Sequence, residues 1–138
     1  MTTLSLSQIT EIFAYANQAS PNECCGLIGG KEEGRVQSIY SLRNVAAEKT
    51  VSYEAAPEDL FAAQRQMRQR GESLLGIYHS HPRSSDPEPS ATDVRLAFYP
   101  RAIYFIIGLA GSEPVMRAFR ISERDDRWEP VEYDVAGE

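Results

Sequence analysis

The chain has 138 residues, of which 42% are hydrophobic and 25% charged, and its formal net charge is −6. These values are typical of one soluble globular domain, which we expect to cover residues 1–138. The acidic balance argues against a nucleic-acid partner, and no apolar run approaches the ~18 residues of a membrane span. Because the first residues also lack the pattern of a signal peptide, we expect a cytoplasmic protein.

The first part of the chain predicts a helix followed by two paired strands. Residues 6–19 carry apolar side chains at helical spacing, and Ser5 before them opens a sequence with capping-box spacing. Residues 24–30 are a short apolar run bounded by glycines, which is typical of a buried strand. We expect a turn over residues 31–34 and a partner strand over residues 35–42.

A loop over residues 44–56 leads to a second helix, expected from Pro57 to about Arg70. Proline suits the first turn of a helix, and Gly71 suits its end. The apolar edge of this helix is expected to contain four side chains, those of Leu60, Phe61, Gln64 and Met67.

The second half of the chain continues with a strand over residues 73–81 and a loop over residues 82–89, where three prolines exclude regular structure. A third helix should start at Ser90. We then expect a central, fully buried strand, its hairpin partner and a last edge strand that Pro130 confines to the edge, over residues 101–110, 114–121 and 128–135. This order of elements predicts an α/β fold with one mixed sheet and helices on its faces.

The chain's two histidines, His79 and His81, lie at the end of the strand over residues 73–81. Side chains at positions i and i+2 of a strand point to the same face, so the pair is a promising start for a metal site. Asp93 is the natural third ligand, because Ser90 and Asp93 have the spacing of an N-cap and the third residue of a helix. Three protein ligands are typical of a catalytic zinc site, which keeps one position open for water.

Plainer readings exist for each of these residues. The histidines could form a surface pair, Ser90 could serve only as an N-cap, and Asp93 could be only a carboxylate favoured by the helix dipole. Asp86 and Glu88 in the nearby loop are expected to be solvated.

Zinc hydrolysis also needs a general acid/base. Glu23, just before the first strand, is the best candidate, although it could equally be an exposed salt-bridging residue. Spacing alone does not place Glu23 near the histidines.

Three segments together resemble the JAMM (MPN+) zinc metalloprotease family. They are "PNECCGLIGG", "GIYHSHP" and "PSATDV", and they fill all five positions of a signature made of an upstream glutamate, H-S/T-H-P and S-x-x-D. The similarity spans Glu23 to about Leu109, and the short chain resembles the small stand-alone prokaryotic branch. The resemblance implies a three-layer JAB/MPN fold, similar to that of cytidine deaminases. The deaminase pattern H-x-E with P-C-x-x-C is missing, which disfavours deamination.

The resemblance also implies a role for each site residue. His79, His81 and Asp93 would hold one Zn²⁺ per chain, with a metal-bound water as the nucleophile. Glu23 would accept the proton of that water and pass it to the leaving amine, and Ser90 would stabilise the oxyanion. One departure is the loop between His81 and Ser90, which has eight residues where family members usually have seven.

By the same resemblance, the substrate is the peptide bond after the C-terminal Gly-Gly of a ubiquitin-like sulfur-carrier protein. The carrier tail would lie in a groove along residues 44–56 and 82–89. Three alternatives stay open: a JAMM peptidase for another peptide or isopeptide, a non-catalytic MPN interaction scaffold, and a cysteine peptidase that uses Cys24 or Cys25. We expect both cysteines to be small buried hydrophobes in a reducing compartment. An exposed sheet edge near the C-terminus would permit a homodimer, which nothing else in the sequence indicates.

Overall fold

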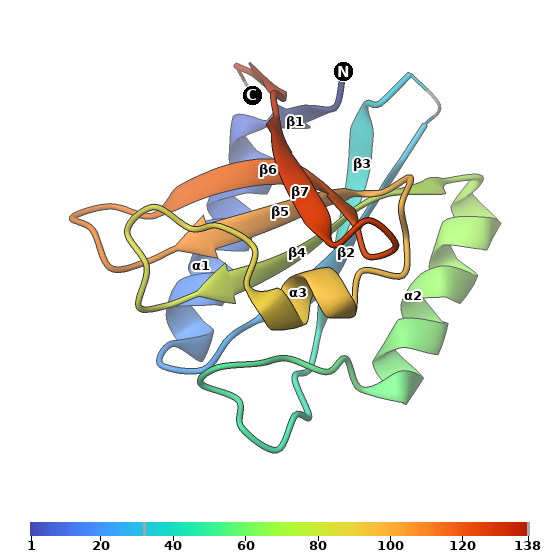
Figure 1. Cartoon of the computed structure of the whole chain (residues 1–138). Coiled ribbons are helices and arrows are strands. Elements are labelled where there is room, and N and C mark those ends of the chain that lie inside the picture. The colour runs from blue at the N-terminus through green and yellow to red at the C-terminus, as the bar shows by residue number, and fades with distance from the viewer. Residues whose placement is uncertain (32, 138) are drawn as a thin grey trace.

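A computed structural model describes residues 1–31 and 33–137; the expected turn at 31–34 includes Glu32 and so lies partly outside them. A six-stranded mixed sheet forms the middle layer, with strand order β3-β2-β4-β5-β6-β7. Helix α1 covers one face of this sheet, and α2 and α3 lie on the opposite side (Figure 1). The predicted three-layer α/β fold is therefore confirmed.

The elements follow the chain in this order: β1 (Thr3–Ser5), α1 (Leu6–Ala19), β2 (Cys25–Gly30), β3 (Val36–Leu42), α2 (Pro57–Arg70), β4 (Ser73–His81), α3 (Ala91–Arg95), β5 (Ile103–Gly108), β6 (Val115–Ser122), β7 (Arg127–Val131) and β8 (Asp134–Ala136). The central pair, β4 and β5, is parallel, and every other neighbouring pair of the large sheet is antiparallel.

The local signals of both long helices are confirmed. Ser5 caps α1, where its hydroxyl accepts the backbone N–H of Gln8 and the Gln8 side chain accepts the N–H of Ser5. Helix α2 ends at Gly71, which has φ +66°, a left-handed conformation that glycine adopts at no steric cost.

Two apolar clusters fill the space between the three layers. One packs α1 against one face of the sheet and contains Ile12, Tyr78 and Phe105. The other packs α2 and α3 against the opposite face and contains Met67 and Ile106. All six residues of β5 are buried, as expected for a central strand covered on both faces.

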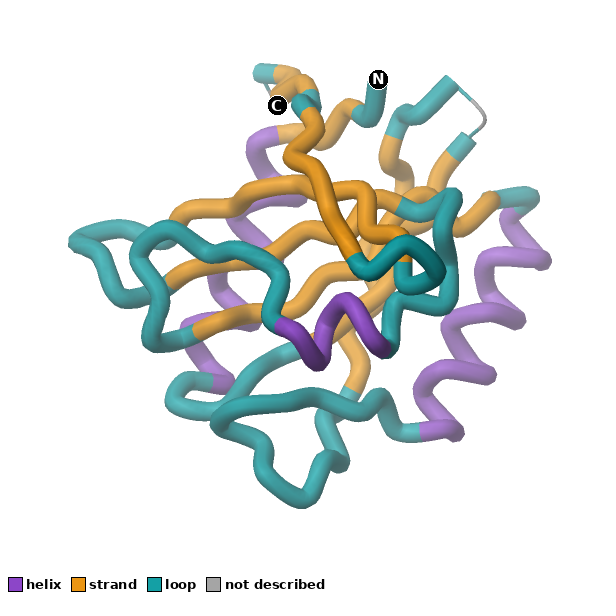
Figure 2. Tube along the Cα trace, viewed as in Figure 1, coloured by secondary structure: helices purple, strands orange, loops and turns teal. Residues whose placement is uncertain are grey.

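Two expectations about the elements were wrong. The single edge strand expected over residues 128–135 is two strands: β7 closes the large sheet with Pro130 on its edge, and β8 pairs in parallel with β1. This second, two-stranded sheet brings the two ends of the chain together (Figure 2). In addition, Phe61 of α2 is 62% exposed, and the buried side chains of that helix are those of Ala63 and Met67.

Candidate metal centre

The two histidines project from the carboxyl end of β4 toward the α3 side of the sheet. Their Nε2 atoms lie 3.1 Å apart, which confirms that residues i and i+2 of this strand share a face. Ser80, between them, points to the other face, where its hydroxyl accepts the buried backbone N–H of Cys24 at 2.8 Å. Ser80 thereby fastens the start of β2, next to Glu23, to the segment that carries both histidines.

Asp93 completes a triangle of potential ligand atoms. Its Oδ2 lies 3.1 Å from Nε2 of His79 and 3.0 Å from Nε2 of His81. A capping box sets this position: the Ser90 hydroxyl accepts the Asp93 N–H at 3.0 Å, and Asp93 Oδ2 accepts the Ser90 N–H at 2.9 Å. The predicted N-cap is therefore confirmed, and it orients the carboxylate toward the histidines.

The triangle matches the chemistry and size of a zinc site. Ligands bound at about 2.0–2.1 Å in a tetrahedral arrangement lie about 3.3 Å from one another. The three separations here are 3.0–3.1 Å. Two imidazole nitrogens and a carboxylate oxygen this close repel each other unless a shared proton or a cation lies between them. Nδ1 of His79 is buried without a hydrogen-bond partner among the described residues, and this atom would carry the ring proton when Nε2 binds a metal.

Glu23 lies beside the triangle. The fold places it near the histidines, which spacing along the sequence could not predict. Ligand atoms of Glu23, His79 and His81 lie within 4.8 Å of one another, which would also allow Glu23 to be a ligand. Burial raises the pKa of Glu23 to about 7, the charge of His81 lowers it and that of Asp93 raises it. A carboxyl group with this pKa can both accept and donate a proton near neutral pH.

The electrostatics of Asp93 differ from those of Glu23. Burial alone would raise the pKa of Asp93, but the charge of His79 and hydrogen bonds from both histidines and Ser90 hold it below its ordinary range. Burial lowers the pKa of His81, and its hydrogen bond with Asp93 reverses the net direction to a raised value. Asp93 is thus ionised and suited to ligation, whereas Glu23 is suited to proton transfer.

Asn44 is a site-supporting residue that the sequence pattern did not reveal. Its side-chain Nδ2 donates to the backbone oxygens of Glu23 at 2.9 Å and Ser52 at 3.1 Å. Its Oδ1 accepts the N–H groups of Ala46 and Glu54, both at 3.0 Å. One amide therefore connects the loop over residues 44–56 to the backbone of Glu23.

The same loop also contacts the histidines. The Tyr53 ring stacks on His79 with a centroid distance of 4.6 Å and an interplanar angle of 25°. Burial raises the pKa of Tyr53 well above its ordinary value, so its hydroxyl stays neutral. The backbone N–H of Glu23 donates to the oxygen of Lys49 at 2.7 Å. The loop over residues 44–56, which was expected only to line a groove, therefore orients Glu23 and His79.

The loop over residues 82–89 is held against the sheet. Asp86 and Glu88 are exposed, as expected, and in addition Arg117 of β6 contacts them at 3.0 Å and 3.6 Å. The partner of both carboxylates is Arg117, which lies outside the triangle of His79, His81 and Asp93. Within this loop Pro87 and Pro89 are buried.

The two cysteines are buried, as predicted, and they lie on opposite faces of the sheet. Cys24 belongs to the α1 cluster and Cys25 to the α2 cluster. Burial raises the pKa of the Cys24 thiol to about 11 and that of Cys25 to about 12. Neither residue forms a thiolate near neutral pH, which argues against the cysteine-peptidase alternative.

A family profile described as prokaryotic homologs of the JAB domain matches residues 5–122. The chain is a prokaryotic JAB-domain protein. This assignment confirms the resemblance noted from the three sequence segments, and the match includes every residue of the proposed centre. Among the described residues of the JAB domain, no helix is long and apolar enough to cross a membrane.

Several relatives of this JAB domain carry functional names. A desampylase of Haloferax volcanii is 41% identical over 87 residues, which cover 62% of this chain and 62% of that protein. A probable TtuB-protein conjugate cleaving protease of Thermus thermophilus is 35% identical over 83% of this chain and 72% of its own length. The CysO-cysteine peptidase of Mycobacterium tuberculosis is 29% identical over 89% of this chain and 84% of its own length.

Solved structures share the fold. A protein from Desulfitobacterium hafniense is 38% identical, with a TM-score of 0.87 and coverage of 100% of this chain and 94% of that one. A JAB1/MPN domain protein from Archaeoglobus fulgidus is 20% identical, with a TM-score of 0.67 and 99% coverage of both chains. The sheet and helices of this JAB domain are therefore those of JAB/MPN proteins.

Proposed function

We propose that this JAB domain is a zinc-dependent peptidase that hydrolyses the peptide bond after the C-terminal Gly-Gly of a ubiquitin-like sulfur-carrier protein. The observation that carries the proposal is the triangle of His79, His81 and Asp93 with the protonatable carboxyl group of Glu23 beside it. The names of the relatives support a hydrolase that acts on carrier conjugates.

His79, His81 and Asp93 would hold the zinc ion. A zinc ion bound there would supply a nucleophilic water at neutral pH and polarise the scissile carbonyl as a Lewis acid. Glu23 would accept a proton from the attacking water and donate it to the leaving amine, for which its pKa of about 7 is suited. The exposed Ser90 hydroxyl already accepts the Asp93 N–H, and its own proton is free to stabilise the oxyanion.

The first test is the metal content of protein purified without chelators, measured by elemental mass spectrometry. We expect one zinc per chain in the native protein and in Glu23→Gln, and none in His79→Ala. A metal-free native protein would contradict the zinc peptidase and favour the alternative of a non-catalytic interaction scaffold. Equal loss of zinc in Glu23→Gln and His79→Ala would make Glu23 a ligand and contradict its proton-transfer role.

The second test is cleavage of a ubiquitin-like carrier extended beyond Gly-Gly. Glu23→Gln should lower kcat by about 100-fold or more, the usual contribution of a general acid/base. Ser90→Ala should lower kcat by a similar factor, worth about 3 kcal/mol.

A matched control exists for Ser90, because Ser5 caps α1 with the same kind of capping box far from the centre. Ser5→Ala should cost about 1 kcal/mol of stability, as Ser90→Ala does through its cap, and leave kcat unchanged. Equal activity of the two variants would refute the role of Ser90 in catalysis.

A further inference from the structure

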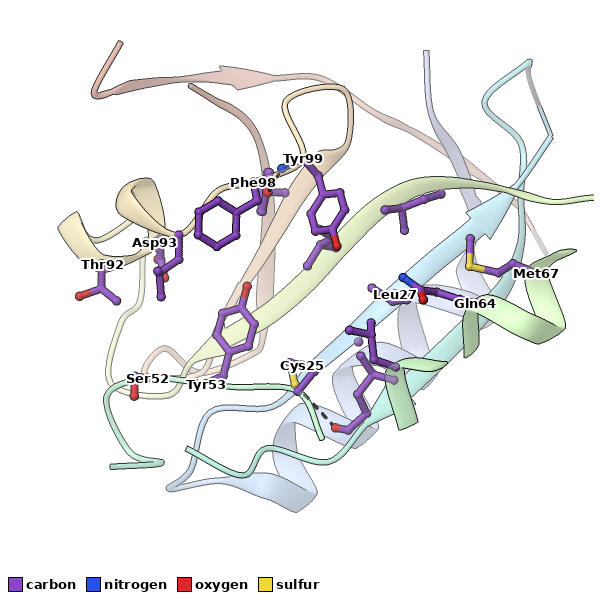
Figure 3. A pocket seen from close by; sticks show the side chains of 18 residues that line it. Cys25, Leu27, Ser52, Tyr53, Gln64, Met67, Thr92, Asp93, Phe98 and Tyr99 are labelled. Carbon is purple, nitrogen blue, oxygen red and sulfur yellow. Dashed lines mark hydrogen bonds between the residues drawn. The ribbon is translucent and has the colours of Figure 1, made fainter. Parts of the chain in front are cut away.

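The candidate metal centre lies between two hollows of opposite character. One is an apolar cavity of about 280 Å³ between α2, α3 and the sheet, and Asp93 and Tyr53 are part of its wall. In Figure 3 Asp93 and Tyr53 lie toward the left of the view, and Gln64 and Met67 line the opposite end of the cavity. The other hollow is an open cleft of about 290 Å³, lined by polar residues that include Glu23, His81 and Ser90.

The position of Glu23 orients a substrate across these two hollows. In the proposed reaction Glu23 gives its proton to the leaving amine, so the leaving group must lie on the Glu23 side of the scissile bond. Glu23 lines the open cleft and does not line the apolar cavity. The open cleft is therefore the leaving-group side, and the acyl part of the substrate, the carrier tail, extends toward the cavity.

The open cleft contains one arginine, Arg83, two residues after His81. Arg83 is exposed and forms no ion pair within residues 1–31 and 33–137, in contrast to Arg117, which is engaged by Asp86 and Glu88. The hydroxyl residues Thr50 and Ser84 line the same cleft. A guanidinium group with a free fork of N–H donors is suited to bind a carboxylate at two points.

A carboxylate next to the scissile bond distinguishes two kinds of leaving group. A single amino acid attached through its α-amine keeps a free α-carboxylate two bonds from the leaving nitrogen. A lysine side chain of a conjugated protein has no carboxylate there. The net charge of −6 would repel an anionic leaving group from most of this surface, so a local cation matters for its binding.

We propose that Arg83 binds the α-carboxylate of the leaving group, and that the preferred substrate is a carrier whose Gly-Gly is extended by a single amino acid. This inference rests on the proposed function. Hydrolysis adds water across the C–N bond between the last glycine and the added residue. The hydroxyl goes to the glycine carbonyl carbon, and one proton goes through Glu23 to the amine, which releases the carrier carboxylate and a free amino acid.

The test uses CysO, the protein named in the Mycobacterium tuberculosis relative, as the carrier. It compares CysO extended by one alanine, with either a free carboxylate or a C-terminal amide, as substrates of the zinc-loaded protein. Arg83→Gln should lower kcat/KM for the free carboxylate by about tenfold, mainly through KM, and leave the amide unchanged. Arg83→Lys should recover part of the loss. The control Arg124→Gln, an exposed arginine on the β6–β7 turn, should change neither substrate. Equal effects of Arg83→Gln on the two substrates would overturn the inference.

A binding measurement separates failure of this inference from failure of the proposed function. The Glu23→Gln protein, loaded with zinc, should bind the free-carboxylate carrier about tenfold more tightly than the amide, and the added Arg83→Gln change should abolish that difference. Native protein that cleaves neither carrier would refute the proposed peptidase. If zinc-loaded Glu23→Gln binds the free-carboxylate carrier and the amide with equal affinity, the role of Arg83 is refuted, whether or not cleavage is observed.

Discussion

Asn44→Ala removes the amide that connects the loop over residues 44–56 to Glu23. The substitution deletes four hydrogen bonds of 2.9–3.1 Å, two donated by Nδ2 and two accepted by Oδ1. The oxygen of Glu23 then loses the Nδ2 donor that fixes it. We expect both a loss of stability and a displacement of the Glu23 carboxyl group from the ligand triangle.

The expected size of the effect follows from these contacts. A typical hydrogen bond in a folded protein contributes about 0.5–1.5 kcal/mol net. Asn44 is half-buried, so water replaces part of what is lost, and about 2 kcal/mol is a realistic total. For a domain of this length 1 kcal/mol corresponds to about 4 °C in Tm, so the expected decrease is about 8 °C. A displaced acid/base should also lower kcat at least about tenfold.

Thermal unfolding followed by circular dichroism and steady-state cleavage of an extended carrier measure the two effects. Asn17→Ala, at an exposed position of α1, is the matched control and should change stability by less than about 0.5 kcal/mol. Asn44→Ala with the Tm and kcat of the native protein would refute the positioning role. A lower Tm with unchanged kcat at 20 °C would leave Asn44 with a purely structural role.

Three further changes test other parts of the structure. Ser80→Ala leaves the buried N–H of Cys24 without its side-chain acceptor and should cost about 1–3 kcal/mol in urea unfolding. In metal-free protein the pKa of Glu23 is raised from 4.5 to about 7, so the folded state binds this proton more tightly than the unfolded state does. The free energy of unfolding should therefore fall as the pH rises through this interval, and less steeply in Glu23→Gln. Gly26→Ala would place a Cβ 2.2 Å from the Tyr78 ring and should destabilise the sheet by at least about 1–3 kcal/mol.

The Ser80 and Gly26 substitutions have matched controls, and the pH profile has an outcome that would contradict it. Ser80→Thr keeps the hydroxyl and should recover most of the stability that alanine loses. Gly111→Ala places its Cβ 3.7 Å from the nearest atom, an ordinary contact, and should be almost neutral. Parallel pH profiles of native protein and Glu23→Gln would show that the Glu23 carboxyl group keeps an ordinary pKa, and would contradict its burial beside the centre.

Much of the fold could be predicted because its signals are local. The bounds of α1 and α2 follow from caps, helical spacing and the glycine after α2, all set by neighbours within a few residues. The divided C-terminal segment could not be predicted in this way. Whether residues 134–136 continue β7 or pair with β1 depends on where the opposite end of the chain lies.

The sequence by itself indicated the three residues that we propose as ligands of the centre. The shared face of His79 and His81 follows from strand geometry, and the orientation of Asp93 follows from a capping box only four residues long. Asp93 Oδ2 lies 3.0–3.1 Å from Nε2 of both histidines. This proximity requires that the loop over residues 82–89 bring α3 back to the end of β4.

Only the tertiary structure decided what surrounds those ligands. Glu23 is 56 residues or more from both histidines in the chain, and the pairing of β2 with β4 brings it to them. Asn44 and Tyr53 belong to a loop with no periodic pattern, so their contacts with Glu23 and His79 left no signal in the sequence. Local patterns record interactions between neighbours along the chain, whereas the pKa of a buried carboxyl group depends on everything that excludes water from it.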